Sequence, residues 1–244
     1  MMFKQLFYIC AIYGVVESAK LPKTWTACKS NDPKKEECLK GAIQHAIRDL
    51  SNGGKASLGV LPMDPLHFDM ITVDQGDGPV AIKLEFFNLD LIGLKTINVN
   101  SVKNDWKSMV VDLIVPKLTL RGQYKVNGKV LVLPIKGDGD CKLEFTNYKV
   151  IGNLKIKEVK KGDKKHFEVV QFQIKPTQEK VFIQFDNLFN GDKALGDNMN
   201  RFLNENSQEI LQELGPAISR AFGTAFKTIS NRIFSKVPSN EINL

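Results

Sequence analysis

The chain has 244 residues, of which 43% are hydrophobic and 25% charged, and this balance excludes a disordered or fibrous protein. Its net charge of +7 is compatible with an anionic partner, but the lysines are scattered along the chain. The densest run, residues 157–165, contains Gly162-Asp163 and is typical of a hairpin turn. A solvated surface is therefore the preferred interpretation, and a membrane-binding or polyanion-binding face is the alternative.

The first 19 residues have the pattern of a secretory signal peptide. Lys4 supplies a positive start, and an apolar run of about ten residues follows between Leu6 and Val16. Such a run is too short to span a bilayer, and a short buried helix is the alternative interpretation. We expect residues 1–19 to be cleaved from a secreted, extracellular protein. Residues 20–244 then form a single domain with no integral membrane segment.

Three cysteines lie beyond this segment: Cys28, Cys38 and Cys141. Two of them should pair in a secreted protein, and a bond between Cys28 and Cys38 would close a short loop. On the chain-entropy argument this bond contributes about 3 kcal/mol. Cys141 alternates with Leu143 and Phe145, which favours a buried, inert thiol over a reactive or intermolecular one.

An N-terminal helix is predicted next. Asp32 can cap it, Pro33 fits its first position, and Gly53-Gly54 can end it. Apolar residues between Leu39 and Leu50 recur at helical spacing. The disulfide would tie the segment containing Trp25 to this helix.

The middle of the chain changes to the two-residue period of β-strands. The alternating apolar positions are Val80, Ile82, Leu84 and Phe86; Met109, Val111, Leu113 and Val115; Leu118, Leu120, Tyr124 and Val126; Val130 and Val132; Cys141, Leu143 and Phe145; Val170, Phe172 and Ile174; and Val181, Ile183 and Phe185. Turns are predicted at residues 75–79, at Asn127-Gly128, at residues 137–140 and at Gly162-Asp163. No helix-length segments separate the strands, so the sheet should be antiparallel. Pro116 and Pro134 suggest bulges or bends.

A long C-terminal helix is predicted from Leu195 to Ser235. Apolar residues recur there every three or four positions, and about 40 residues at 1.5 Å each would extend roughly 60 Å. A helix of that length requires an elongated molecule or a bend, and Gly215-Pro216 is the expected bend. The predicted fold class is α+β, with a strongly curved antiparallel sheet rolled around this helix.

Enzyme motifs are not found in the sequence. The histidines (His45, His67 and His166) are far apart, the cysteines lack zinc spacing, and Ser57 does not lie in a nucleophile motif. Aromatic residues do not alternate with arginines as they do in nucleic-acid-binding proteins. We therefore expect no catalysis, no cofactor, no metal and no nucleic-acid partner.

Several segments, in this order and spacing, resemble the insect takeout and haemolymph juvenile-hormone-binding protein family. They are Cys28 and Cys38 ahead of a helix, LGVLPMDPL at 58–66, residues 75–94, the Asp105-Trp106 pair, residues 116–139 and residues 188–206. The resemblance implies a tubular lipid-binding fold that encloses a hydrophobic tunnel. Only Cys141 is left for a second disulfide, which places the chain nearer the takeout branch.

Inward-facing residues of the sheet and the helix are expected to be either core or tunnel lining. The candidates for ligand contact are Trp25, Leu84, Phe86, Val111, Leu113, Leu143, Phe145, Val170, Phe172, Ile183, Phe185, Phe202, Ile210, Phe222, Phe226 and Ile229. Tyr124 and Tyr148 are candidates, by residue type only, for contact with a polar ligand group.

The predicted function is a secreted, monomeric carrier of one small elongated hydrophobic ligand, such as a juvenile-hormone-like terpenoid or a fatty acid. The alternative is a surface-active protein that binds membranes or envelope lipids through its basic face. Salt distinguishes the two, because only binding to anionic vesicles should fall sharply with ionic strength.

Overall fold

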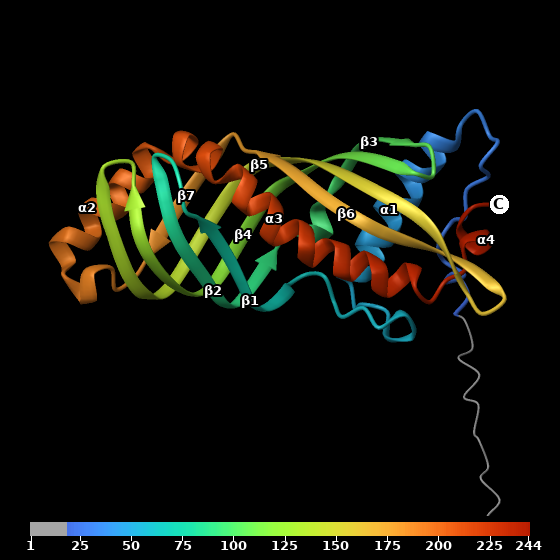
Figure 1. The fold of residues 1–244 in the computed structure, drawn as a ribbon, viewed down its shortest axis with the longest axis horizontal. Coiled ribbons are helices and arrows are strands. Elements are labelled where there is room, and N and C mark those ends of the chain that lie inside the picture. The colour runs from blue at the N-terminus through green and yellow to red at the C-terminus, as the bar shows by residue number, and fades with distance from the viewer. Residues whose placement is uncertain (1–18) are drawn as a thin grey trace, which may run out of the picture.

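The computed structural model describes residues 19–244, so the predicted signal peptide lies almost wholly outside the described residues. An elongated molecule results, with α2 at one end and α1 and the C-terminus at the other (Figure 1). The helices are α1 (Lys35–Ser51), α2 (Lys193–Glu205), α3 (Ser207–Phe234) and α4 (Ser239–Ile242). The strands of the single antiparallel sheet are β1 (Leu66–Gln75), β2 (Val80–Ile92), β3 (Asn98–Asn104), β4 (Ser108–Val130), β5 (Leu133–Lys161), β6 (Lys164–Thr177) and β7 (Lys180–Phe185).

The central pair of strands, β4 and β5, runs almost the whole length of the molecule and changes neighbours halfway. Toward one end β4 also pairs with β2 and β5 with β7, and toward the other end they pair with β3 and β6. Pro116 lies at this change on β4 and has no N–H to donate. Asn147, opposite it on β5, has a positive φ of 48°. The irregularity predicted at Pro116 is therefore where the curled half of the sheet meets the extended half.

Helix α3 closes the open side of the curled sheet, between its edge strands β1 and β6. Toward β6, Asn231 of α3 accepts a hydrogen bond from the Val169 N–H and donates one to the Val169 carbonyl oxygen. Ser219 of α3 accepts a hydrogen bond from the Ile174 N–H. On the other side, the ring of Phe222 in α3 packs edge-on against the ring of Phe68 in β1, with 5.9 Å between the ring centroids. The hydrogen bonds from α3 pair backbone polar groups of the edge strand β6 that would otherwise have no partner.

Helix α2 uses the same arrangement on β7. Asn200 bonds both the N–H and the carbonyl oxygen of Phe185, and Asn204 does the same with Ile183. Because each asparagine amide carries one acceptor and one donor group, it can pair with a strand residue as another strand would.

The C-terminal helix is not continuous, contrary to the prediction. It breaks at Asn206, between α2 and α3, and it continues through Pro216, where the bend was expected. The Asn206 N–H and side-chain amide both donate to the Phe202 carbonyl oxygen, which closes the end of α2. Pro216 has no N–H to bond the carbonyl oxygen four residues earlier in the helix. Because Pro216 is exposed, water can bond that oxygen instead.

Two predicted turns are wrong. Asn127-Gly128 lies inside β4 and residues 137–140 lie inside β5, while the hairpin between them turns at Leu131 and Val132. The glycines are needed for close approach: a Cβ at Gly128 would lie 2.2 Å from the Ala81 oxygen, and one at Gly139 would lie 2.7 Å from the Asp186 oxygen. The turns at residues 75–79 and at Gly162-Asp163 are confirmed.

The N-terminal helix begins at Lys35, two residues later than predicted. Asp32 still stabilises its start, because its carboxylate accepts a hydrogen bond from the Lys34 N–H. Cys28 and Cys38 form the predicted disulfide, and Cys141 is free and buried. The predicted fold class is confirmed: a curved antiparallel sheet with a long C-terminal helix and a helix at the N-terminus.

Candidate ligand-binding cavity

A cavity of about 860 Å³ lies between the concave face of the sheet and α3. Its lining residues on β4 extend from Met109 to Val130, which is nearly the full strand. The cavity therefore follows the long axis of the molecule. Its volume falls in the range of about 300–1,000 Å³ that is usual for small-molecule sites.

Most of the predicted contact residues line this cavity. They are Leu84, Phe86, Val111, Leu113, Leu143, Phe145, Phe172, Ile183, Phe185, Ile210, Phe222 and Phe226. The two-residue period of the strands places the sheet residues on one face, and the helical period places the residues of α3 opposite them. Phe172 of β6 and Phe226 of α3 both line the cavity and contact each other, with 5.9 Å between their ring centroids.

Four predicted contact residues do not line it. Trp25 packs in a separate cluster at the α1 end, and its indole N–H donates to Asp49 at 2.7 Å. Phe202 packs against the core from α2, and Ile229 borders a groove between α3 and β1. Val170 is 37% exposed.

The exposure of Val170 has a local cause, a β-bulge. Lys155 pairs with Gln171 and Ile156 with Val169, so Val170 is an extra residue on β6. The bulge shifts the alternation, and Val169 is buried in place of Val170. A period-2 pattern read through the bulge therefore assigns Val170 to the wrong face.

Apart from Tyr148 and Ser230, the polar residues of the lining gather in one region, which we call the mouth. It comprises Gln173, Lys175, Thr177 and Gln178 near the end of β6 and Gln208, Gln212 and Ser219 in the first half of α3. Most of these residues are exposed, whereas the rest of the lining is almost entirely apolar. The cavity thus opens between the end of β6 and the start of α3.

The structure separates the two candidate tyrosines. Tyr124 is buried and its hydroxyl donates its one proton to the Asp186 carbonyl oxygen at 2.7 Å, so it has no donor left for a ligand. Tyr148 lines the cavity, and no residue in the described part of the chain hydrogen-bonds its hydroxyl. Burial raises the pKa of Tyr148, so the hydroxyl keeps its proton. Tyr148 can therefore donate a hydrogen bond to a polar atom inside the cavity.

Sequence reasoning missed part of the lining. Val150 and Leu154, on the second half of β5, line the cavity on either side of Gly152, and Ile43 and Ile47 reach it from α1. Alternation across residues 148–156 was available as a signal, but Gly152 interrupts it. The apolar stripe of α1 was detectable, yet nothing in it indicates that it faces a cavity rather than a solid core.

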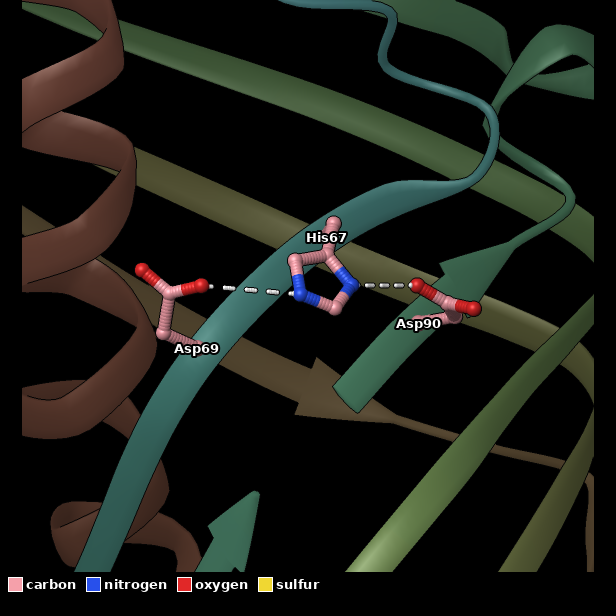
Figure 2. A network of polar contacts seen from close by, with 3 residues as sticks. All are labelled: His67, Asp69 and Asp90. Carbon is pink, nitrogen blue, oxygen red and sulfur yellow. Dashed lines mark hydrogen bonds and ion pairs between the residues drawn. The ribbon is translucent and has the colours of Figure 1, made fainter. Parts of the chain in front are cut away.

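Figure 2 shows a polar network of His67, Asp69 and Asp90 on β1 and β2. None of these three residues lines the cavity. Nδ1 of His67 lies 2.7 Å from an oxygen of Asp90, and Nε2 lies 3.6 Å from an oxygen of Asp69. His67 and Asp90 are register partners across the two strands, so their contact fixes β1 against β2. Among the described residues, no group of His, Cys, Asp and Glu side chains could hold a metal ion, and no helix is long and apolar enough to cross a membrane.

Comparisons with known proteins agree with this geometry. The chain is 24% identical to the circadian clock-controlled protein daywake of Drosophila melanogaster, over 92% of this chain and 88% of daywake. It is 22% identical to daywake of Drosophila yakuba with the same coverage. The crystal structure of Takeout 1 from Epiphyas postvittana is similar, with a TM-score of 0.75, 27% identity, and coverage of 89% of this chain and 98% of Takeout 1.

The resemblance seen in the sequence is confirmed by a family model. The model for the haemolymph juvenile hormone binding protein family matches residues 6–244, nearly the entire chain. The chain therefore belongs to the haemolymph juvenile hormone binding protein family.

Proposed function

We propose that this protein is a carrier that holds one elongated, mostly apolar molecule in its internal cavity and releases it chemically unchanged. The observation that carries the proposal is the composition of the lining: apolar side chains along the whole length, with most of the polar residues near the end of β6 and the start of α3. The family description and the extended shape of the cavity support the same ligand class, that of juvenile-hormone-like terpenoids and fatty acyl compounds.

Burial of apolar surface provides enough energy for such binding. At about 25 cal/mol per Å², a ligand with roughly 400 Å² of apolar surface would gain about 10 kcal/mol before entropy losses. After those losses, dissociation constants between micromolar and nanomolar are expected.

Secretion is part of the proposal. The signal-peptide pattern of residues 1–19 supports it, and so does the Cys28–Cys38 disulfide, because such bonds persist mainly in oxidising compartments. We further propose that the mature domain comprises residues 20–244 and acts as a monomer in extracellular fluid.

Tyr148 is proposed to hold the polar end of a neutral ligand. Its free hydroxyl lies in an apolar lining, where a hydrogen bond is not weakened by competition with water. An ester, ether or epoxide oxygen is a suitable acceptor.

The proposal is tested by displacement of a fluorescent fatty-acid probe. Long-chain esters and terpenoids should displace it at micromolar concentration or below, and they should be recovered intact. Tyr148→Phe should weaken ester binding about fivefold, the value of one hydrogen bond, and leave a linear hydrocarbon of equal length unaffected. Equal competition by compact polar compounds would contradict the carrier function. Strong, salt-sensitive binding to anionic vesicles without probe displacement would favour the surface-active alternative.

A further inference from the structure

The extended half of the sheet has an outer face that is directed away from α1 and the cavity. This half consists of residues 98–104, 108–114, 149–155 and 171–177, in β3, β4, β5 and β6. Helix α1 packs on its inner face, and the cavity lies on that same face. Because side chains alternate along a strand, the residues between the inward-facing ones are directed outward.

Four lysines that are far apart in the sequence gather on this outer face. They are Lys103, Lys149, Lys155 and Lys175, and all four are exposed. Strand β6 borders the mouth at Lys175, but Lys175 alternates with the buried Ile174, so its side chain belongs to the outer face. In the part of the chain that the structure describes, none of the four lysines forms an ion pair with an acidic side chain.

Acidic residues do not balance this charge. Asp112 is the single acid within the four segments, so four lysines and one aspartate leave a net charge of +3. The outer face of the curled half differs, because acids lie among its lysines. Lys83 pairs there with Glu85 at 2.9 Å. Lys125 opposes Asp138 across β4 and β5. Positive charge is therefore concentrated on the extended half.

Apolar side chains lie among these lysines. Ile151 is 43% exposed, with Lys149 two residues before it on β5 and Lys175 opposite it on β6. Val110 and Ile114 of β4 are half-buried on the same face. Lysines attract anionic head groups, and apolar side chains beside them can enter the boundary between head groups and acyl chains. This mixture fits an anionic lipid surface better than a soluble polyanion, which offers nothing to the apolar side chains.

We propose that the outer face of the extended half docks the protein reversibly on anionic phospholipid membranes. The inference goes beyond the proposed carrier function and requires no bound ligand, so it can fail while the carrier function stands. Each lysine close to an anionic surface strengthens binding about fivefold. The cavity lies on the opposite face of the sheet, so a docked protein can keep its ligand.

Sedimentation of the mature protein with phospholipid vesicles tests the proposal. Vesicles of phosphatidylcholine with about 30% phosphatidylglycerol should bind the wild-type protein about tenfold or more above pure phosphatidylcholine vesicles. Salt at about 0.5 M should remove most of this difference. The triple variant Lys149→Gln/Lys155→Gln/Lys175→Gln should bind the anionic vesicles roughly a hundredfold more weakly, at about fivefold for each lysine.

The matched control replaces three exposed lysines of the curled half, Lys125, Lys129 and Lys136, with glutamine. It removes the same charge from the protein, but it should leave vesicle binding within about threefold of wild type, because distant exposed charges are screened. Circular dichroism of both triple variants should match that of the wild-type protein, since only exposed side chains change.

The outcomes decide whether this face docks on membranes. Equal losses in the two triple variants would mean that net charge, and not this face, governs binding, and they would overturn the proposal. Equal binding of the wild-type protein to anionic and neutral vesicles would overturn it as well. Ile151→Asn should weaken binding to anionic vesicles about threefold. No effect of Ile151→Asn, together with tight binding of the wild-type protein to heparin, would assign the face to a soluble polyanion instead.

Discussion

The Cys141 thiol is enclosed by the sheet, beside the backbone of Gly122 and Phe185. It is 3% exposed, and burial raises its pKa to about 12. Nearby Asp140 and Asp186 oppose the thiolate further. Because the thiolate is the reactive form, this cysteine should be inert in the folded protein.

Thiol labelling at pH 8 tests this directly. Native protein should take up no label, and protein unfolded without reductant should take up one. Labelling of native protein, or of more than one thiol before reduction, would show that Cys141 is accessible or that the Cys28–Cys38 bond is not formed.

Asp49 connects the N-terminal segment to α1. Its carboxylate accepts from the Trp25 indole at 2.7 Å and pairs with Lys55 at 2.9 Å. The hydrogen bonds from Lys55 and Trp25 lower the pKa of Asp49 below its ordinary value. A lowered folded-state pKa stabilises the fold above the ordinary carboxyl pKa, and this contribution is lost as pH falls through the folded value.

Asp49→Asn should therefore reduce the free energy of unfolding by about 1 kcal/mol at pH 7. The difference from wild type should start to shrink as the pH falls through the ordinary carboxyl pKa, where Asp49 of the unfolded chain becomes protonated, and it should be smallest below the lowered pKa of folded Asp49. Urea unfolding at several pH values measures both effects. The matched control is Asp69→Asn, at a fully exposed carboxylate, which should change stability by less than about 0.5 kcal/mol. A pH-independent loss in Asp49→Asn would refute the electrostatic explanation.

Among the elements, α3 determines how tightly the open side of the curled sheet is closed. Gly223 lets the helix approach β6 so closely that a Cβ there would lie 2.2 Å from the Phe172 carbonyl oxygen. Phe172 lines the cavity, so the position of the helix also shapes the candidate site. A Cβ at Gly41, in the interior of α1, would have no heavy atom within 4 Å.

The two glycines thus predict opposite effects. Gly223→Ala should destabilise the protein by about 2–3 kcal/mol, because backbone must shift to admit the methyl group. Gly41→Ala should stabilise it by up to about 1 kcal/mol, since alanine is the better helix former. Midpoints of urea unfolding compare the two variants, and a gain of the same size in both would mean that helix propensity, not close approach to β6, governs the effect at position 223.

The sequence predicted those elements whose period is regular. Alternation in residues 80–86 and 141–145 identified the inward face, and helical spacing identified Phe222 and Phe226. β3, with the sequence NVNSVKN, carries too few apolar residues to give such a signal. Gly128, Gly137 and Gly139 are of the residue type typical of turns, but in the structure they allow close contact with segments far away in the chain. Bulges and helix breaks, as at Val170 and Asn206, likewise depend on tertiary packing.

At the scale of the whole molecule, the sequence predicted an apolar interior but could not divide it into core and cavity. Leu89 and Val169 have the same apolar character as Leu84 and Phe172, yet only the latter two line the cavity. The division depends on the distance between α3 and the sheet. Gly223, Asn231 and Ser219 make the close contacts that hold α3 against β6. None of these residue types indicates a cavity in the sequence.

Native mass spectrometry with an added long-chain ester tests the central claim most directly. The mature protein incubated with hexadecyl acetate should show one additional mass equal to a single intact ester. The compact triester of glycerol and acetic acid, offered at the same concentration, should give no such complex. Absence of the one-to-one complex with hexadecyl acetate, or recovery of the ester as alcohol and acetate, would contradict the account of a cavity that carries one elongated apolar ligand unchanged.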